Sequence, residues 1–334
     1  MATTAQSTEA TTRQDHPHRH VRLPGDLDYL RTAIVNVYFY GRPHAKDRDW
    51  VLIDAGIPGS AGAIAAYAAE RFGPDSRPGA IVLTHGHFDH VGALEELAAR
   101  WDVPVYTHEL ELPYLTGRSS YPPPDPTVGG GLLASLSWMY PRGPIDLGDR
   151  VRLLPRSGSV PGMSGWKWLH TPGHTAGHVS LFRVADRTLI AGDAFTTVKQ
   201  ESARAVMEQR PEVHGPPAYY TQDWDAAQES VRRLAELEPR LAATGHGVPM
   251  AGESLQIGLQ ALARDFDRIA RPRQGRYIHE PVQADASGTV SIPPRNAIPL
   301  SAMLVSFGTG MALGLGLAAM LPAPRHRRHH GWWA

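Results

Sequence analysis

Residues 84–90 read Thr-His-Gly-His-Phe-Asp-His, and this stretch decides how the rest of the sequence is interpreted. It follows a short apolar run and precedes a helix-like pattern. Alternate side chains of an extended segment point to the same side, so His85 and His87 can bind one ion together. Asp89 and His90 come after the bend into the helix, where they can face a second ion beside the first. Three imidazoles and a carboxylate packed so closely therefore indicate a metal centre rather than scattered surface histidines.

Three further segments repeat this arrangement, each with an apolar strand-like run followed by a residue that can bind a metal. They are residues 168–174 (WLHTPGH), 189–193 (LIAGD) and 241–246 (LAATGH). Open α/β sheets place their sites at the carboxyl ends of strands, so we expect His174, Asp193 and His246 to join the first cluster. The chain has no cysteine, so any metal must be bound through nitrogen and oxygen.

The motifs HGHFDH, HTPGHTAGH, AGD and TGHG, in this order, resemble the motif series of the metallo-β-lactamase superfamily over about residues 20–270. The resemblance implies an α/β fold of four layers, the αββα metallo-β-lactamase sandwich, with two metal ions at its edge. It implies that the first ion is bound by His85, His87 and His174, the second by Asp89, His90 and His246, and that Asp193 bridges both. Imidazole and carboxylate ligands suit divalent ions, with Zn²⁺ expected first and Fe²⁺ or Mn²⁺ as alternatives.

The chemistry expected from this resemblance is hydrolysis. Two neighbouring ions can share a metal-bound hydroxide that attacks a carbonyl carbon, and Asp89 is the candidate catalytic residue that holds or accepts its proton. The expected substrate is a carboxylic ester, thioester or lactone, since glyoxalase II-like thioesterases and lactonases resemble the motif set most closely. Three alternatives stay open: a mononuclear-iron persulfide-type dioxygenase, a phosphodiesterase of the same fold, and a non-catalytic metal-binding scaffold.

Three more polar residues near the motifs have supporting roles in this interpretation. His178 is expected to orient a ligand, with a purely structural histidine as the equal alternative. Asp54 is expected to be a buried support for the first loop, and His170 to be structural.

Substrate contacts are expected from loops, because loops vary freely on such a scaffold. A long stretch rich in proline and glycine, residues 118–144, is typical of a lid. The candidates are Tyr121, Trp138 and Tyr140 in that stretch and Lys199, His214, Tyr219 and Tyr220 after Asp193.

Short strand-like and helix-like runs alternate around these motifs, which is typical of a layered α/β fold. Strands are predicted at residues 33–40, 50–53, 80–83, 166–169, 179–184, 188–191 and 241–243, and helices at 61–72, 92–100, 224–237 and 255–269. The predicted organisation is a disordered tail (1–20), a metallo-β-lactamase-fold catalytic domain (21–272), an extended linker (273–297) and an apolar C-terminal segment with a basic tail (298–334).

The charge balance bears on the partners of the chain. Its 33 basic and 33 acidic residues give no field that would concentrate a polyanion, so we expect a small-molecule substrate and no nucleic acid.

Residues 300–321 are uncharged and long enough to span a bilayer, and a basic run follows at 325–328. Two interpretations stay open for them: a transmembrane helix, or an apolar helix packed on the domain or on a partner chain. Gly310 and Gly314 form a GxxxG face that would allow a homodimer. The first twenty residues lack the apolar core of a signal peptide, so we expect a cytoplasmic catalytic domain that is membrane-associated through the C-terminal segment.

Overall fold

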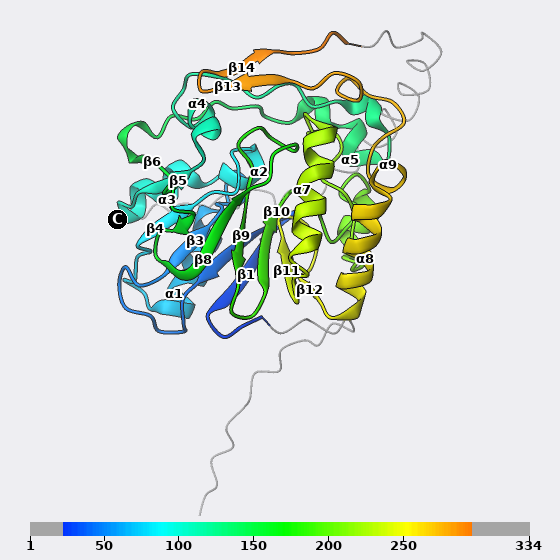
Figure 1. The fold of residues 1–334 in the computed structure, drawn as a ribbon. Helices are drawn as coiled ribbons and strands as arrows, with labels where there is room; N and C mark the ends of the chain where they lie inside the picture. The colour runs from blue at the N-terminus through cyan, green and yellow to red at the C-terminus, as the bar shows by residue number, and fades with distance from the viewer. Residues whose placement is uncertain (1–22, 296–334) are drawn as a thin grey trace, which may run out of the picture. The chain divides into compact units, whose positions relative to one another are not determined.

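Two six-stranded sheets form the framework in the computed structural model of the protein, which describes residues 23–295 (Figure 1). The first sheet has the strand order β1 (Leu27–Thr32), β2 (Val35–Tyr40), β3 (Val51–Ile53), β4 (Ala80–Val82), β5 (Val105–Thr107) and β6 (Val151–Leu153). Its first two pairings are antiparallel, and the pairings from β3 to β6 are parallel.

The second sheet has the order β12 (Met250–Ala251), β11 (Leu241–Thr244), β10 (Thr188–Gly192), β9 (Val179–Arg183), β8 (Met163–His170) and β7 (Ser159–Val160). Its pairings are antiparallel except for the parallel pair β10–β11. The carboxyl ends of β10 and β11 therefore lie at the same edge of this sheet.

Helices connect and cover the strands. The α-helices are α1 (Ala61–Phe72), α2 (Phe88–Val91), α3 (Leu94–Trp101), α4 (Leu112–Leu115), α5 (Leu132–Ser135), α6 (Ala203–Glu208), α7 (Trp224–Glu236), α8 (Glu253–Arg264) and α9 (Phe266–Ile269). The 3₁₀ turns of the described region are η1 (Glu109–Glu111), η2 (Pro126–Val128), η3 (Ser137–Met139) and η4 (Gly148–Arg150).

Three buried clusters show that the layers stack as helix, sheet, sheet and helix. Strand β2 explains the arrangement, because Val37 and Phe39 pack with residues of α1 and α3 whereas Tyr38, between them, packs between the sheets. The cluster between the sheets joins Tyr38 to Leu181 and Ile190 of the second sheet. The outer face of that sheet is covered by α7 and α8 (Figure 1). The predicted four-layer αββα sandwich is thus confirmed.

The predicted elements differ from the observed ones mainly at turns and edges. The strand predicted at 33–40 begins only at Val35, because the chain turns at Ala33, with a φ of 58°, between β2 and the strand β1, which was not predicted. The strands β5, β6, β7 and β12 were not predicted, since strands of two or three residues are too short to show an alternating pattern.

The segment predicted as an extended linker (273–297) includes, within its described residues 273–295, a hairpin of β13 (Gln283–Asp285) and β14 (Gly288–Ser291). The amide of Thr289 donates to Ser119 Oγ at 3.1 Å, and the amide of Val282 donates to the carbonyl of Gln222 at 3.1 Å. Tyr277 is buried and its hydroxyl donates to the carbonyl of Pro123. These contacts attach the segment to the domain.

The predicted tail at 1–20 and the apolar segment at 298–334, including residues 300–321, lie outside the described residues. Within residues 23–295, none of the helices is both long and apolar enough to cross a membrane.

The entry into α3 depends on a close contact at Gly92. A Cβ atom there would lie 2.2 Å from Pro58 N and 2.3 Å from Ile57 C, both backbone atoms. The amide of Gly92 also donates to the carbonyl of Gly56 at 2.7 Å. The helix that follows the THGHFDH stretch is therefore held against the loop after β3.

We predict that Gly92→Ala lowers the free energy of unfolding by about 1–3 kcal/mol, because an added methyl group must displace backbone. Gly62→Ala is the matched control, since a Cβ at Gly62 in α1 meets nothing within 4 Å. That change is expected to be neutral or stabilising by up to about 1 kcal/mol. Urea denaturation of both variants measures the difference, and equal stabilities would contradict the close-contact argument.

Candidate metal centre

The candidate ligands of the sequence motifs meet at one edge of the two sheets. His85 and His87 follow β4, and the short helix α2 carries Asp89 and His90. The other three follow strands of the second sheet: His174 lies in the loop after β8, Asp193 directly follows β10, and His246 follows β11. None of the seven residues is more than 5% exposed. Strand ends and one tight turn thus bring together residues that lie up to 161 positions apart in the chain, from 85 to 246.

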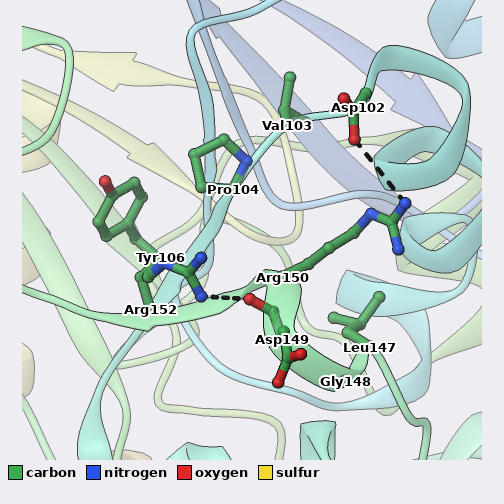
Figure 2. A pocket seen from close by; sticks show the side chains of 9 residues that line it. All are labelled: Asp102, Val103, Pro104, Tyr106, Leu147, Gly148, Asp149, Arg150 and Arg152. Atoms are coloured by element: carbon green, nitrogen blue, oxygen red, sulfur yellow. Dashed lines mark hydrogen bonds and ion pairs between the residues drawn. The ribbon is translucent and has the colours of Figure 1, made fainter.

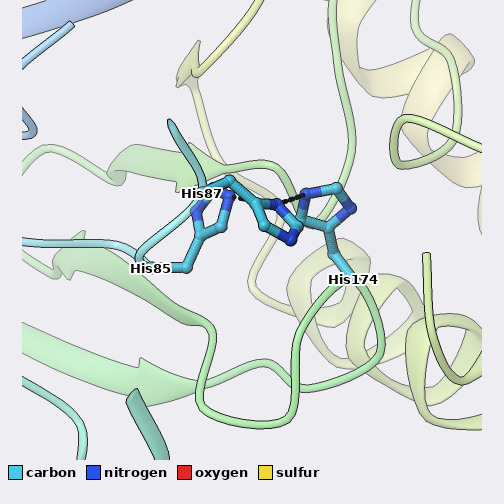
Figure 3. Close-up of side chains that lie close together, drawn as sticks. All are labelled: His85, His87 and His174. Atoms are coloured by element: carbon cyan, nitrogen blue, oxygen red, sulfur yellow. Dashed lines mark hydrogen bonds between the residues drawn. The ribbon is translucent and has the colours of Figure 1, made fainter. Parts of the chain in front are cut away.

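The first group consists of three imidazoles that point toward one another (Figure 3). The Nδ1 atom of His87 lies 3.0 Å from His85 Nε2 and 3.0 Å from His174 Nε2. Two nitrogens bound at about 2.1 Å to one tetrahedral zinc ion lie about 3.4 Å apart. The observed spacing therefore needs only a small adjustment to bind such an ion.

Hydrogen bonds outside the cluster direct the Nε2 lone pairs of His85 and His174 into this group. His85 Nδ1 lies 3.1 Å from Thr84 Oγ1, and His174 Nδ1 lies 3.3 Å from Thr221 Oγ1. Both hydroxyl protons are already donated elsewhere, to Asp54 and to the Pro217 carbonyl, so each hydroxyl accepts from the imidazole. Both Nε2 atoms are then unprotonated, which is the tautomer that binds a metal.

The second group consists of Asp89, His90 and His246. His90 Nδ1 donates to Asp54 Oδ2 at 2.8 Å, and His246 Nδ1 donates to the Ile34 carbonyl at 2.7 Å. The Nδ1 atoms of both imidazoles are thus bound outside the site, and their Nε2 atoms face into it. Asp89 Oδ2 lies 3.5 Å from His246 Nε2.

Asp193 lies between the two groups. Its Oδ2 atom is 3.5 Å from His174 Nε2 of the first group. The same atom is 3.5 Å from His90 Nε2 and 3.1 Å from His246 Nε2 of the second group. One carboxylate oxygen within 3.5 Å of ligand atoms from both groups has the position of a bridging ligand.

Burial sets the protonation of the imidazoles in the first group. It lowers the pKa of His85 and His87 well below the usual value and that of His174 to about 3, so these rings are neutral at pH 7. Neutral imidazoles are the form that binds a metal.

The carboxylates of Asp89 and Asp193 and the imidazoles of His90 and His246 shift one another's pKa values. Burial alone would raise the pKa of Asp193, but His246 and His90 hold it well below the usual value. Burial would likewise lower the pKa of His90, yet the charges of Asp193 and Asp54 raise it well above the usual value. Burial raises the pKa of Asp89. Asp193, which lies between the two groups, is therefore ionised at pH 7.

Several buried polar atoms of the cluster find no hydrogen-bond partner within residues 23–295. Two of them are ligand atoms, His90 Nε2 and Asp193 Oδ1; the third is His87 Nε2, the ring nitrogen other than the Nδ1 atom that faces His85 and His174. Buried polar atoms are otherwise almost always paired. Nitrogen and oxygen ligands converging around a buried carboxylate, with such atoms left over, fit bound divalent cations.

Two of the three predicted supporting residues, Asp54 and His178, form hydrogen bonds with residues of the metal groups. Asp54 accepts from the Thr84 amide and hydroxyl, each at 2.8 Å, as well as from His90. His178 Nε2 accepts from the Asp193 amide at 2.9 Å, and its Nδ1 donates to the Thr171 carbonyl at 3.1 Å. His170 donates to the Ala176 carbonyl through Nε2 and stacks on His108, with ring centroids 4.3 Å apart.

Three of the seven predicted substrate residues lie beside the metal groups. Tyr220 stacks on His87, with centroids 4.2 Å apart and an interplanar angle of 25°. Tyr140 and Tyr219 pack with Tyr220 and Phe88 in one small buried cluster. The charge of Asp89 contributes to raising the pKa of all three tyrosines, after the larger effect of burial. These tyrosines form an aromatic wall next to Asp89.

The other four candidates lie differently. Tyr121 is 2% exposed and packs against His87, and its hydroxyl donates to Glu111, so its role as a substrate contact stays a prediction. Trp138 is 67% exposed on η3, and Lys199 is also exposed. His214 pairs with Glu212 at 3.3 Å. Within the described part of the chain, none of these last three is in contact with the metal groups.

Glu111 is a buried carboxylate next to the site that the sequence did not reveal. It ends η1 and accepts hydrogen bonds from Gly86, Tyr121, Thr175 and Gly177. In the sequence it belongs to a Glu-Leu-Glu run that looks like an ordinary solvated turn. Only the tertiary structure brings its partners together.

A separate hollow lies on the first sheet near the start of β5, where Tyr106, Arg150 and Arg152 line it (Figure 2). Arg150 lies 3.8 Å from the Asp102 carboxylate there. The lining includes no residue of the metal groups, so we do not assign the chemistry to it.

Comparisons with known proteins agree with this fold and site. Residues 30–246 match the family model of the metallo-β-lactamase superfamily. A relative named "Probable metallo-hydrolase YflN", from Bacillus subtilis strain 168, is 50% identical over 240 residues, which cover 72% of this chain and 90% of the relative. "Probable metallo-hydrolase YybB" from the same organism is 30% identical over 203 residues, covering 60% and 78%.

Among solved structures, a B3 metallo-β-lactamase with an active-site glutamic acid aligns with a TM-score of 0.50 at 18% identity, over 76% of this chain and 90% of that one. This likeness shows the fold alone. The αββα sandwich and the buried histidine and aspartate groups at its edge define a class of metal-binding α/β proteins. The chain belongs to the metallo-β-lactamase superfamily.

We predict that Asp54→Asn weakens binding of divalent metal by about 10- to 100-fold, which is the usual cost of losing a partner of a ligating histidine. In either orientation the asparagine NH2 group faces a donor: the Thr84 amide in one, and the Thr84 hydroxyl and His90 Nδ1 in the other, so the hydrogen bonds that fix Thr84 and His90 cannot all be kept. Competition with a chelator measures the affinity. Asp186→Asn is the control, because Asp186 also accepts a backbone amide but lies in the turn at the opposite end of β10 from Asp193. Equal affinity in both variants would contradict the role of Asp54.

Proposed function

We propose that the protein is a metal-dependent hydrolase that binds two divalent ions, Zn²⁺ first among the candidates, and cleaves a carboxylic ester, thioester or lactone. The observation that carries the proposal is the position of Asp193 Oδ2 within 3.5 Å of ligand atoms from two groups. His85, His87 and His174 would hold the first ion, and Asp89, His90 and His246 the second. The catalytic unit would be residues 21–272 together with the hairpin that follows.

The completeness of the second group supports a two-ion site over the mononuclear-iron alternative. Asp89, His90 and His246 are buried, and their ligand atoms lie within 4.8 Å of one another. A chain that needed only the first three imidazoles would have no reason to bury a second carboxylate and two more imidazoles. The two Bacillus subtilis relatives are each named "Probable metallo-hydrolase", which favours hydrolysis over oxygenation.

Bound divalent ions would lower the pKa of a water molecule and polarise the bond to be cleaved. Asp89 is the candidate to hold and accept the proton of that water, because its buried carboxylate has a raised pKa and faces the second group. The side chain of His178 fixes the backbone of Asp193 and so holds the bridging carboxylate in place. The chain thus supplies a proton acceptor and a rigid ligand frame.

The aromatic wall favours a substrate with apolar surface. Tyr140, Tyr219 and Tyr220 cluster with Phe88. Phe88 directly precedes Asp89 in the sequence. Tyr140 and Phe88 are only partly buried, so this wall reaches the surface. A phosphodiester would call instead for cationic side chains. An organic acyl compound, such as an ester, thioester or lactone, therefore fits the wall better.

The test is hydrolysis by the full chain loaded with Zn²⁺, Mn²⁺ or Fe²⁺, assayed on a thioester, a lactone, an aryl ester, a β-lactam and a phosphodiester. We expect turnover of a carboxylic ester, thioester or lactone. Turnover of the phosphodiester alone, or oxygen consumption with one bound iron, would contradict the proposal.

Two variants assign the roles. Asp89→Asn is expected to lower kcat by about 10²- to 10⁴-fold, the range for a lost general base. Asp193→Ala is expected to lower metal content and activity together, because it removes the ligand shared by both groups. Metal analysis alongside the assay separates the two effects, with Asp186→Asn as the control. Full activity in Asp193→Ala would rule out the bridging assignment.

A further inference from the structure

Glu111 is fully buried, yet it belongs to neither candidate metal group. Its carboxylate accepts four hydrogen bonds, two on each oxygen. Oε1 accepts from the Thr175 hydroxyl at 2.6 Å and from the Gly177 amide at 3.0 Å. Oε2 accepts from the Gly86 amide at 3.0 Å and from the Tyr121 hydroxyl. Every partner is a donor, so the site is built for a carboxylate.

The four partners belong to the two segments that carry the first imidazole group. Gly86 lies between His85 and His87, and Thr175 directly follows His174. Tyr121 packs its ring against His87, with centroids 4.6 Å apart, and its hydroxyl also accepts from the Gly86 amide. A single carboxylate therefore joins the loop after β4 to the loop after β8.

Two glycines make room for this carboxylate and for its partner Tyr121. A Cβ atom at Gly177 would lie 2.7 Å from Glu111 Cγ, and one at Gly86 would lie 2.7 Å from the Tyr121 hydroxyl. Real Cβ atoms do not approach other atoms so closely. The glycine in HTAGH is thus explained by Glu111, and the glycine in HGH by the tyrosine that donates to Glu111.

We infer that Glu111 is a positioning residue that sets the spacing between His87 and His174 by holding their two loops together. The inference rests on the proposed metal-dependent function, because the spacing matters only if these imidazoles share an ion. The spacing in question is the 3.0 Å between His87 Nδ1 and His174 Nε2. Glu111 contacts neither substrate nor metal and acts through the two loops.

Glu111→Gln tests the role with almost no change in shape. A glutamine has one acceptor oxygen, and its amide group would face the Gly86 or the Gly177 backbone donor in either orientation. We expect the affinity of the full-length protein for Zn²⁺, measured by competition with a chelator, to fall by about 10- to 100-fold. The absorption spectrum of the Co²⁺-loaded protein is expected to change as well, because it reports the geometry around the ion.

Asp125→Asn is the matched control. Asp125 is also a buried carboxylate, and it accepts from the Thr127 amide and hydroxyl and from the Arg276 amide, none of which belongs to the metal groups. We expect it to keep the wild-type Zn²⁺ affinity and Co²⁺ spectrum. A role limited to holding the fold would lower the Tm of the metal-free Glu111→Gln protein and leave its metal affinity and spectrum unchanged, which would overturn the inference.

A second pair of variants decides the matter if Glu111→Gln does not fold. Thr175→Val removes one donor to Glu111, whereas Thr175→Ser keeps it. Weaker Zn²⁺ binding in the valine variant, with recovery in the serine variant, supports the inference, and equal binding in both overturns it. Wild-type protein that binds no divalent metal would overturn the proposed function and this inference together. Wild-type binding matched by Glu111→Gln would overturn only the inference.

Discussion

The fold brings unprotonated imidazole nitrogens close together in a buried space, and the rest of the site follows from this constraint. The Nδ1 atom of His87 lies 3.0 Å from the Nε2 atoms of both His85 and His174. Hydrogen bonds from Nδ1 to Thr84 and Thr221 leave two of these nitrogens without a proton. Neutral imidazole nitrogens that converge in this way suit a bound divalent cation. The cluster is therefore best explained as a metal site.

Such a cluster needs support from outside, and different elements of the fold supply it. Asp54, at the end of β3, accepts the Nδ1 proton of His90, and His178, at the start of β9, holds the Asp193 amide. Glu111, from η1, joins the two loops that carry the first group. Because these supports come from both sheets, the sandwich itself determines the geometry of the site. The same supporting side chains leave no room for a Cβ atom at Gly177, next to Glu111, or at Gly192, next to His178.

Much of this arrangement could be predicted from the sequence, because it is encoded locally. In the THGHFDH stretch, the alternation of side chains along an extended chain predicts that His85 and His87 point to the same side. Helices such as α1 and α7 show their buried face through a helical period, so their predicted bounds agree with the structure to within about one residue. The αββα layering followed from the family resemblance of the motifs.

The remaining features depend on contacts between distant segments. Glu111 lies in a short charged run and receives its role only when residues 86 and 177 approach it. Tyr121 was placed among the substrate residues because it lies in a lid-like stretch, but the fold turns it inward behind His87. The hairpin β13–β14 was missed because its few residues show no clear period and are held by bonds to Ser119 and Gln222. No local pattern encodes such contacts.

The central claim is that two ions share Asp193 between the two ligand groups. Anomalous diffraction from crystals of the zinc-loaded protein, measured on both sides of the zinc absorption edge, tests it most directly. The account predicts two zinc peaks, one bounded by His85, His87 and His174 and the other by Asp89, His90 and His246, with Asp193 between them. A single peak, or peaks away from Asp193, would contradict the account.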